Sequence, residues 1–221
     1  MSHSGKTLEI SEVEFNSEYP RLDEISEKLD NLSLKNQVAV LNWKGFGYKP
    51  DVKFSIAYTG HEILLKYYVT EQCFKAEKTE TNQAVYEDSC VEFFFSPSEG
   101  GIYYNFEFNG IGTCLMGSGT GRENRIMVDP EIISRIRRRT SAGEKSISEK
   151  SGEFSWTITI AIPFDIIFHQ TIAELKGKTF RANFYKCGDK LSVPHFVTWN
   201  PVGTDKPDFH KPEYFGFLKF V

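Results

Sequence analysis

The sequence has few cysteines and no closely spaced cysteine pair. Its 221 residues contain four cysteines, and no two of them form a CxxC motif. This spacing excludes the usual zinc-binding patterns and gives no sign of a disulfide scaffold. We therefore expect four free, buried thiols, because an unpaired cysteine packs like a small apolar residue. The four positions are Cys73, Cys90, Cys114 and Cys187.

Long apolar runs are also absent. Residues 1–10 contain no apolar stretch of the kind found in signal peptides, and no segment approaches the ~20 apolar residues of a membrane-spanning helix. As read, the chain is therefore predicted to be cytoplasmic and to have no membrane span. A chain whose leader had been removed would look the same, so a periplasmic or extracellular location stays open.

Basic residues are fewer than acidic residues. The chain has 26 Lys and Arg residues against 30 Asp and Glu residues, which gives a formal net charge of −4. Nucleic-acid binding requires a basic surface, so we do not expect nucleic acid to be a partner. One basic run, Arg135 with residues 137–139, is expected to be a solvated patch.

Familiar catalytic motifs are missing as well. There is no G-x-S-x-G sequence for a hydrolase nucleophile. The glycine-rich run at 117–121 lacks the spacing and the lysine of a phosphate-binding loop, so we expect a flexible loop there. The histidines show no metal-binding spacing, and surface or hydrogen-bonded roles are the expected ones.

Aromatic residues and alternating patterns are abundant. The chain contains 19 Phe and 10 Tyr, which suit strands, and its clearest period-two stripe runs through residues 154–162. Helix signals are confined to residues 17–35, 130–136 and 163–168. The sequence predicts an all-β fold, a two-sheet antiparallel β-sandwich of jelly-roll or immunoglobulin-like type with one or two short helices. We predict a single domain over residues 1–221, with residues 1–36 as an N-terminal extension that packs on it.

One predicted hairpin has a polar outer face. If Val91 and Phe93 face the core, Glu92 faces the opposite way, and residues 103, 105, 107 and 109 of the returning strand share that face. Glu92 then lies near Asn105 or Glu107. Carboxylates, amides and aromatic rings together suit a sugar, although strand faces are commonly polar where they meet solvent.

Two carboxylates on neighbouring strands also raise an enzymatic alternative. Glu92 with Glu107 or Asp88 is the candidate pair, and neighbouring strands allow the roughly 5–9 Å separation of a glycosidase pair. Nothing in the sequence indicates that either carboxyl has a perturbed pKa, so the alternative of a glycoside hydrolase ranks below binding without catalysis.

The three tryptophans have different expected roles. Trp156 belongs to the apolar stripe at 154–162, so we assign it to the core. Trp43 precedes a loop rich in glycine and aromatic residues and is either a rim residue or a core anchor. Trp199 lies where a predicted strand enters a loop, which is compatible with a ligand platform or with a core position.

Several segments resemble the family 9 carbohydrate-binding modules, and in particular the stand-alone members common in gut Bacteroidetes. They are residues 85–94, 104–109, 156–163, 198–201 and 207–216. The resemblance implies a jelly-roll-like sandwich of the DOMON-like type. It also implies a sugar held between two aromatic rings, which map to Tyr86 and Trp199. Glu92 matches the glutamate that binds sugar hydroxyls. Asn105 or Glu107 occupies the place of an arginine, so the resemblance does not carry over the sugar specificity of better-known members.

The resemblance also bears on partners and cofactors. Such modules are often attached to glycosidases such as xylanases, which links them to polysaccharide catabolism. This chain has no room for a catalytic domain, so any glycoside hydrolase would be a separate partner. Some members carry structural calcium, whose ligands we cannot place here, and we expect no other cofactor. Some related DOMON domains bind haem, but Met116, Met127 and the histidines do not form a convincing set of axial ligands.

The predicted function is therefore non-catalytic binding of an oligosaccharide or polysaccharide through Tyr86, Glu92, Asn105, Glu107 and Trp199.

Overall fold

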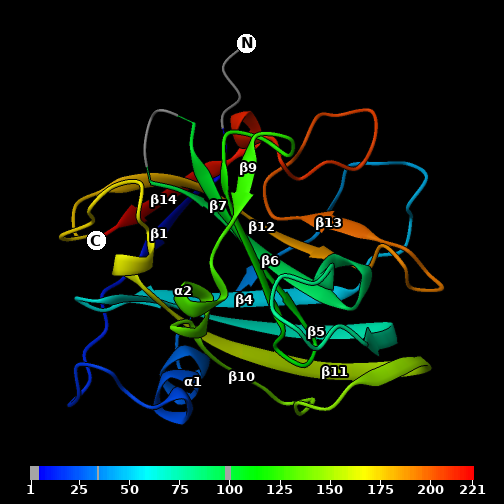
Figure 1. Ribbon diagram of the computed structural model, residues 1–221, viewed down its shortest axis with the longest axis horizontal. Coiled ribbons are helices and arrows are strands. Elements are labelled where there is room, and N and C mark those ends of the chain that lie inside the picture. The colour runs from blue at the N-terminus through cyan, green and yellow to red at the C-terminus, as the bar shows by residue number, and fades with distance from the viewer. Residues whose placement is uncertain (1–4, 34, 98–100) are drawn as a thin grey trace.

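The alternating apolar segments of the sequence form the strands of two sheets that pack face to face (Figure 1). The computed structural model describes residues 5–33, 35–97 and 101–221. The predicted all-β sandwich is confirmed. In the described residues, all strand pairs are antiparallel except β1 with β14, which run parallel.

The larger sheet has nine strands and provides the face on which the candidate site lies. Its main path runs in the order β1-β14-β12-β6-β7-β8-β9, and β13 pairs with β12 and β3. The strands are β1 (Thr7–Ile10), β3 (Val40–Leu41), β6 (Cys90–Ser96), β7 (Tyr103–Asn109), β8 (Cys114–Gly119), β9 (Arg125–Met127), β12 (Thr179–Cys187), β13 (Phe196–Thr198) and β14 (Gly216–Phe220). Part of the turn expected between β6 and β7, residues 98–100, lies outside the described residues.

The smaller sheet has five strands in the order β10-β11-β5-β4-β2. They are β2 (Asn36–Gln37), β4 (Asp51–Tyr58), β5 (Glu62–Ala76), β10 (Arg137–Thr140) and β11 (Ile147–Pro163). The short helices are α1 (Leu22–Asp30) and α2 (Pro130–Ser134), with 3-10 turns η1 (Val85–Glu87), η2 (Phe164–Ile166) and η3 (Pro212–Tyr214). Among the described residues, no helix has the length and apolar character needed to cross a membrane.

The main core lies between the two sheets. Phe184 of β12 stacks on Phe54 of β4, with ring centroids 3.9 Å apart, so the facing sheets interdigitate. Trp156 of β11 is buried in this layer, as its alternating pattern predicts. The four cysteines are buried and free, which confirms the expectation from their spacing.

The outer face of the smaller sheet is covered by α1. Ile25 and Leu29 of this helix pack against Leu64 and Ala161. The described part of the predicted N-terminal extension therefore contributes to both sheets, because it also supplies β1 as an edge strand beside β14.

The outer face of the larger sheet is covered by irregular segments rather than helices. Trp43, Phe209 and Phe215 from two long loops pack over Phe94 and Tyr185 of the sheet. This covering converts a sheet face that would otherwise meet solvent into a second buried cluster. The candidate site lies inside it.

One local expectation is wrong. The glycine-rich run was expected to be a flexible loop, but residues 117–119 belong to strand β8. At Gly119 a Cβ atom would lie 2.0 Å from the carbonyl oxygen of Asn124, so glycine lets the β8–β9 hairpin close. Residues 141–146 connect β10 to β11, which begins at Ile147 and accommodates the polar residues up to 152 through two register shifts.

Candidate functional site

A pocket of about 290 Å³ opens on the outer face of the larger sheet. Its floor is formed by Glu92, Glu107 and Cys187, from the neighbouring strands β6, β7 and β12. The other lining residues come from the covering loops and from the β8–β9 hairpin. They are Phe46, Tyr86, Arg122, Arg125, Asp189, Phe196, Pro207, Asp208, Phe209 and His210.

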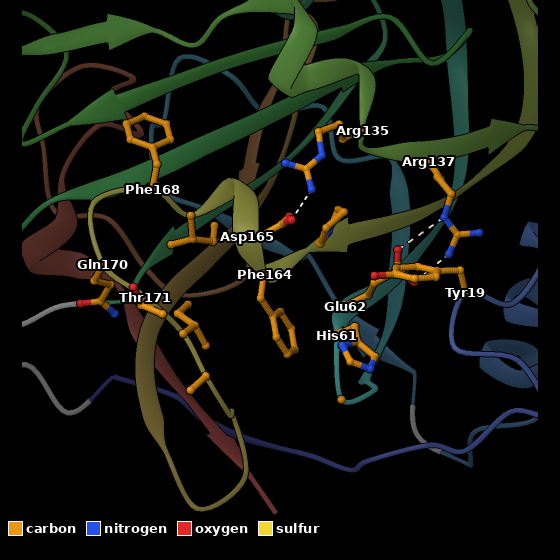
Figure 2. Close-up of a pocket in the computed structure, with 15 residues that line it drawn as sticks. Tyr19, His61, Glu62, Arg135, Arg137, Phe164, Asp165, Phe168, Gln170 and Thr171 are labelled. Atoms are coloured by element: carbon orange, nitrogen blue, oxygen red, sulfur yellow. Dashed lines mark hydrogen bonds and ion pairs between the residues drawn. The ribbon is translucent and has the colours of Figure 1, made fainter.

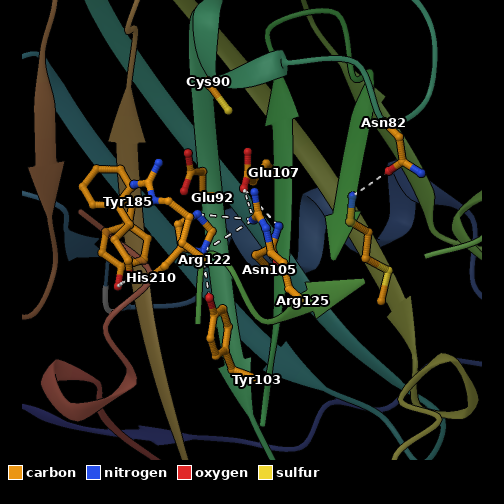
Figure 3. Close-up of polar contacts among 12 residues, drawn as sticks. Asn82, Cys90, Glu92, Tyr103, Asn105, Glu107, Arg122, Arg125, Tyr185 and His210 are labelled. Atoms are coloured by element: carbon orange, nitrogen blue, oxygen red, sulfur yellow. Dashed lines mark hydrogen bonds and ion pairs between the residues drawn. The ribbon is translucent and has the colours of Figure 1, made fainter. Parts of the chain in front are cut away.

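Two glutamates lie side by side at the floor. Glu92 and Glu107 are register partners in the antiparallel pair β6–β7, and both side chains point to the outer face of the sheet (Figure 3). Each residue is only 2% exposed. Burial raises the pKa of Glu107 to about 7. Burial also raises the pKa of Glu92 well above its usual range, and the negative charge of Glu107 adds to this shift.

These carboxyls are only partly supplied with partners. Asn105 donates from Nδ2 to Oε1 of Glu107 at 3.0 Å, and Nη1 of Arg125 lies 3.7 Å from the same oxygen. Glu92 accepts at Oε1 from the thiol of Cys187, at 3.1 Å. Oε2 of Glu107 is buried and has no hydrogen-bond partner. Buried polar atoms nearly always have a partner, so this oxygen is suited to a ligand that brings hydrogen-bonding groups.

Arg125 reaches the floor because a glycine leaves room for it. A Cβ atom at Gly117 of β8 would lie 2.8 Å from Oδ1 of Asn105 and 3.3 Å from Cδ of Arg125. The guanidinium also lies against His210, with Nη1 3.3 Å from Nε2. Burial and the nearby cations Arg125 and Arg122 lower the pKa of His210 to about 3, so the imidazole is neutral at physiological pH.

The mouth of the pocket is charged. Arg122, which is about half exposed, pairs with Asp208 at 3.0 Å. Burial raises the pKa of Asp189 to about 6. The backbone N–H of Asp189 donates to the carbonyl of Tyr86 at 3.0 Å, so this hydrogen bond links two of the segments that line the pocket.

Aromatic rings form the walls. Phe46 and Phe196 meet edge to face with centroids 4.7 Å apart, and both are half-buried, as is Tyr86. Phe209 stacks on Tyr185 with a centroid separation of 4.1 Å. Trp43, for which the sequence left two roles open, is a core anchor: it is buried, and its Nε1 donates to the carbonyl of Thr204.

The structure brings together four of the five residues expected from the sequence. Tyr86, Glu92 and Glu107 line the pocket, and Asn105 acts on it through its hydrogen bond to Glu107. Trp199 does not lie there. It is 4% exposed and belongs to the core between the sheets.

The position of Trp199 has a clear physical cause. Its ring packs edge to face against Phe184 and Phe54. A Cβ atom at Gly216 would lie 2.5 Å from its ring, so glycine at that position allows the approach. The role of a ligand platform, expected for Trp199, is therefore incompatible with its placement, and we leave this residue out of the site.

Asp88 is also separate from the pocket. Its Oδ2 accepts from the backbone N–H groups of Glu77 and Lys78 and from Nδ2 of Asn109. A carboxylate with three donors holds a turn in place. The sequence-based pairing of Asp88 with Glu92 as acid and base therefore has no support in the structure.

Sequence reasoning missed the charged residues Arg122, Arg125 and Asp189 and the neutral His210. They come from hairpins and loops whose fold over the sheet no local pattern reveals. Two signals were available: His210 lies in the 207–216 segment of the family resemblance, and both arginines follow the glycine-rich run.

A larger cavity of about 580 Å³ lies elsewhere, and its charged groups are already paired. Figure 2 shows Arg135 directed to Asp165 and Arg137 to the buried Glu62, the latter pair at 2.6 Å. Arg138 donates to the carbonyl of Gly112. The basic run expected to be a solvated patch is therefore held mostly by specific partners. The smaller pocket, with its unpartnered buried carboxyl oxygen, is the better candidate site.

Comparison with known proteins assigns the family. Residues 23–220 match the model of carbohydrate-binding family 9. The chain belongs to carbohydrate-binding family 9. No curated protein sequence matches it significantly.

Solved structures agree with this family 9 membership. A crystal structure of a protein from Bacteroides uniformis ATCC 8492, assigned a carbohydrate-binding role, is 41% identical, with a TM-score of 0.94 over 99% of this chain and 100% of that one. A family 9 module from Caldicellulosiruptor kristjanssonii in complex with glucose has a TM-score of 0.57 at 11% identity, over 98% of this chain and 96% of that one. Its complex with cellotriose gives the same TM-score and identity over 97% and 93%. At this identity the second protein shares the fold.

Proposed function

We propose that this family 9 domain holds a sugar ring in the pocket on the larger sheet and releases it unchanged. The observation that carries the proposal is the floor of the pocket. Two buried glutamates, one with an unpartnered oxygen, lie beneath walls of half-buried aromatic rings. Such a combination of hydrogen-bonding groups and apolar faces matches the two surfaces of a sugar.

The polar floor would select hydroxyl groups. Glu107 can accept from a hydroxyl at Oε2, or donate to one when it is protonated, because its pKa is close to neutral. Glu92 and Arg125 supply further acceptors and donors around it. The pocket therefore presents both hydrogen-bond donors and acceptors, which suits a hydroxyl because it can donate and accept.

The walls would contact the C–H faces of the sugar. Tyr86, Phe46 and Phe196 retain exposed ring surface at the pocket and come from three different segments. With Trp199 in the core, Tyr86 is the ring that remains from the predicted pair. We assign the opposing apolar surface to Phe46 and Phe196.

The charge of the pocket favours a neutral ligand. Four carboxyls, those of Glu92, Glu107, Asp189 and Asp208, face two arginines. Arg122 is already paired with Asp208, and Arg125 lies beside Glu107, so a uronic acid would find no unpaired cation among these lining residues. A neutral hexose or pentose is therefore the better match. Gluco-oligosaccharides and xylo-oligosaccharides are the first candidates, and a separate glycoside hydrolase acting on the same polysaccharide is the proposed partner.

The geometry favours binding over hydrolysis. In glycosidases the two carboxyl groups flank the scissile bond. Glu92 and Glu107 are instead direct neighbours on one sheet and approach a ligand from the same side. Their raised pKa values suit hydrogen bonding to hydroxyls.

The test is calorimetric titration with glucose, cello-oligosaccharides and xylo-oligosaccharides, with chromatography of each mixture afterwards. We expect saturable binding without cleavage. Tyr86→Ala and Glu92→Gln should each weaken binding at least about tenfold, which corresponds to roughly 1.4 kcal/mol. Tyr19→Ala is the matched control, because this exposed tyrosine lines the other cavity. Two outcomes would refute the proposal. One is cleavage of an oligosaccharide by the wild type that disappears in Glu92→Gln. The other is equal sugar affinity of Tyr86→Ala and Tyr19→Ala.

A further inference from the structure

Two cysteines and a glutamate meet at the floor of the pocket. Cys90 and Cys187 are register partners in the antiparallel pair β6–β12. Glu92 follows Cys90 by two residues and shares its face of the sheet; both are labelled on the same strand in Figure 3. One ligand atom from each residue, two sulfurs and one carboxyl oxygen, lie within 4.8 Å of one another.

This spacing is close to that of a tetrahedral metal site. Zn–S bonds of about 2.3 Å and Zn–O bonds of about 2.1 Å place neighbouring ligand atoms roughly 3.6–3.8 Å apart. The sulfur of Cys187 is already 3.1 Å from Oε1 of Glu92. Small rotations of buried side chains would therefore suffice to surround an ion, without movement of either strand.

The surroundings leave the glutamate available to a cation. No ion pair of Glu92 occurs among the described residues, and Arg125, the nearby cation, pairs with Glu107. The side chain of Glu92 accepts a hydrogen bond from the thiol of Cys187. Glu92 and Cys187 both line the pocket, which provides an entry path and leaves a fourth coordination position open to water.

We propose that Cys90, Glu92 and Cys187 form a binding site for a thiophilic divalent cation of the Zn²⁺ type. Binding releases the two thiol protons, and any proton that the Glu92 carboxyl holds, to solvent, and forms two metal–thiolate bonds and one metal–carboxylate bond. Sulfur ligands select Zn²⁺ or Cd²⁺ over Ca²⁺, which prefers oxygen. The cation site differs in chemistry from the proposed sugar pocket but shares Glu92 with it. A bound ion would therefore lie beneath the sugar.

The experiment is titration of the reduced, metal-free full chain with Cd²⁺ alone, followed by absorption of the thiolate-to-cadmium charge-transfer band. We expect one equivalent to bind, Zn²⁺ to displace it, and Ca²⁺ to have no effect. Cys90→Ser and Cys187→Ser should each lower the affinity by about tenfold or more, as loss of a ligand costs at least as much as loss of a supporting group. Cys73→Ser and Cys114→Ser are matched controls, since these thiols are also free and buried.

A second measurement on the wild-type protein covers the case in which a serine variant does not fold. Zn²⁺ should protect Cys90 and Cys187 together from alkylation, with Cys73 and Cys114 unaffected, as read by mass spectrometry. Absence of a stoichiometric charge-transfer band, or equal effects of all four serine substitutions, would overturn the proposal. Titration of the metal-free chain with sugar tests the proposed function separately, because that measurement contains no metal.

Discussion

At the scale of single residues, two of the three buried tryptophans, Trp156 and Trp199, lead to a direct prediction. Both belong to the core between the sheets, at 3% and 4% exposure. Trp156→Ala and Trp199→Ala should each lower the free energy of unfolding by roughly 3–5 kcal/mol, because truncation of a buried large side chain leaves a cavity. Urea denaturation of the three proteins measures this.

The same pair of variants separates a core role from a ligand role. Below its melting transition, Trp199→Ala should bind sugar as the wild type does, since its ring is absent from the pocket. A Trp199→Ala protein of normal stability that fails to bind would contradict the placement described above.

Glu107 gives a prediction on pH. Its pKa is raised from 4.5 to about 7, so the folded state holds the proton more tightly than the unfolded chain does. The contribution of this group to stability is therefore present at low pH and is lost as the pH rises from about 4.5 through about 7. Glu107→Gln should remove this pH-dependent loss of stability, because glutamine does not titrate.

The measurement is chemical denaturation of the wild type and Glu107→Gln between pH 4.5 and 8. As the pH rises from about 4.5 to about 7, the stability of the variant relative to the wild type should increase. Above about pH 7 this difference should stay constant. Glu123→Gln, an exposed glutamate on the nearby hairpin, is the control and should follow the wild type. Parallel curves for wild type and Glu107→Gln would contradict the predicted linkage.

The direction of Glu92 could be predicted from the sequence, but its burial could not. Alternation from Val91 to Phe95 places Glu92 on the outer face, as observed. Whether that face meets solvent depends on the loops around Trp43 and Phe209, which are distant in the chain. Trp199 was assigned to the wrong place for a related reason: it follows the last residue of β13, where no alternation remains to show its direction.

At the scale of elements, a buried ion pair joins the two sheets. Nζ of Lys186 on β12 lies 2.8 Å from Oε2 of Glu71 on β5, and both side chains are fully buried. Oε1 of Glu71 accepts from Nε1 of Trp156 at 2.7 Å. Lys186→Ala should cost about 3–5 kcal/mol, because it leaves an uncompensated carboxylate inside the protein.

A double variant distinguishes this cause from a packing defect. Lys186→Met with Glu71→Gln removes both charges and retains an acceptor for Trp156. It should recover much of the stability that Lys186→Ala loses, as replacement of a buried pair by neutral groups commonly does. Denaturation of the single and double variants provides the comparison. A double variant less stable than Lys186→Ala would show that the charge left behind is not the cause.

Most strands could be predicted from their residues, and the exceptions have physical reasons. The stripe of residues 154–162 and the hairpin around Gly60 follow the period-two rule. The rule fails at Gly117 and Gly119, where the absence of a side chain accommodates Arg125 and Asn124. It also fails at residues 147–152, where bulges interrupt the alternation.

At the scale of the whole molecule, the shared core predicts cooperative unfolding. Phe54 of one sheet stacks on Phe184 of the other, so neither sheet buries its inner face alone. We expect residues 1–221 to unfold in one step, as a single domain does. The strand signal in circular dichroism and the tryptophan fluorescence should change over the same range of urea concentration. Two separate transitions would contradict the prediction of one domain.

The parallel pair β1–β14 has a mechanical consequence. Thr7 pairs with Phe217 and Ile10 with Phe220, so a tether attached before β1 and another after β14 leave from opposite ends of the paired strands. Tension between them loads the evenly spaced hydrogen bonds of the parallel ladder in shear, all at once, rather than one after another. A protein anchored through these two ends would therefore resist pulling better than one in which the terminal strands could be peeled apart.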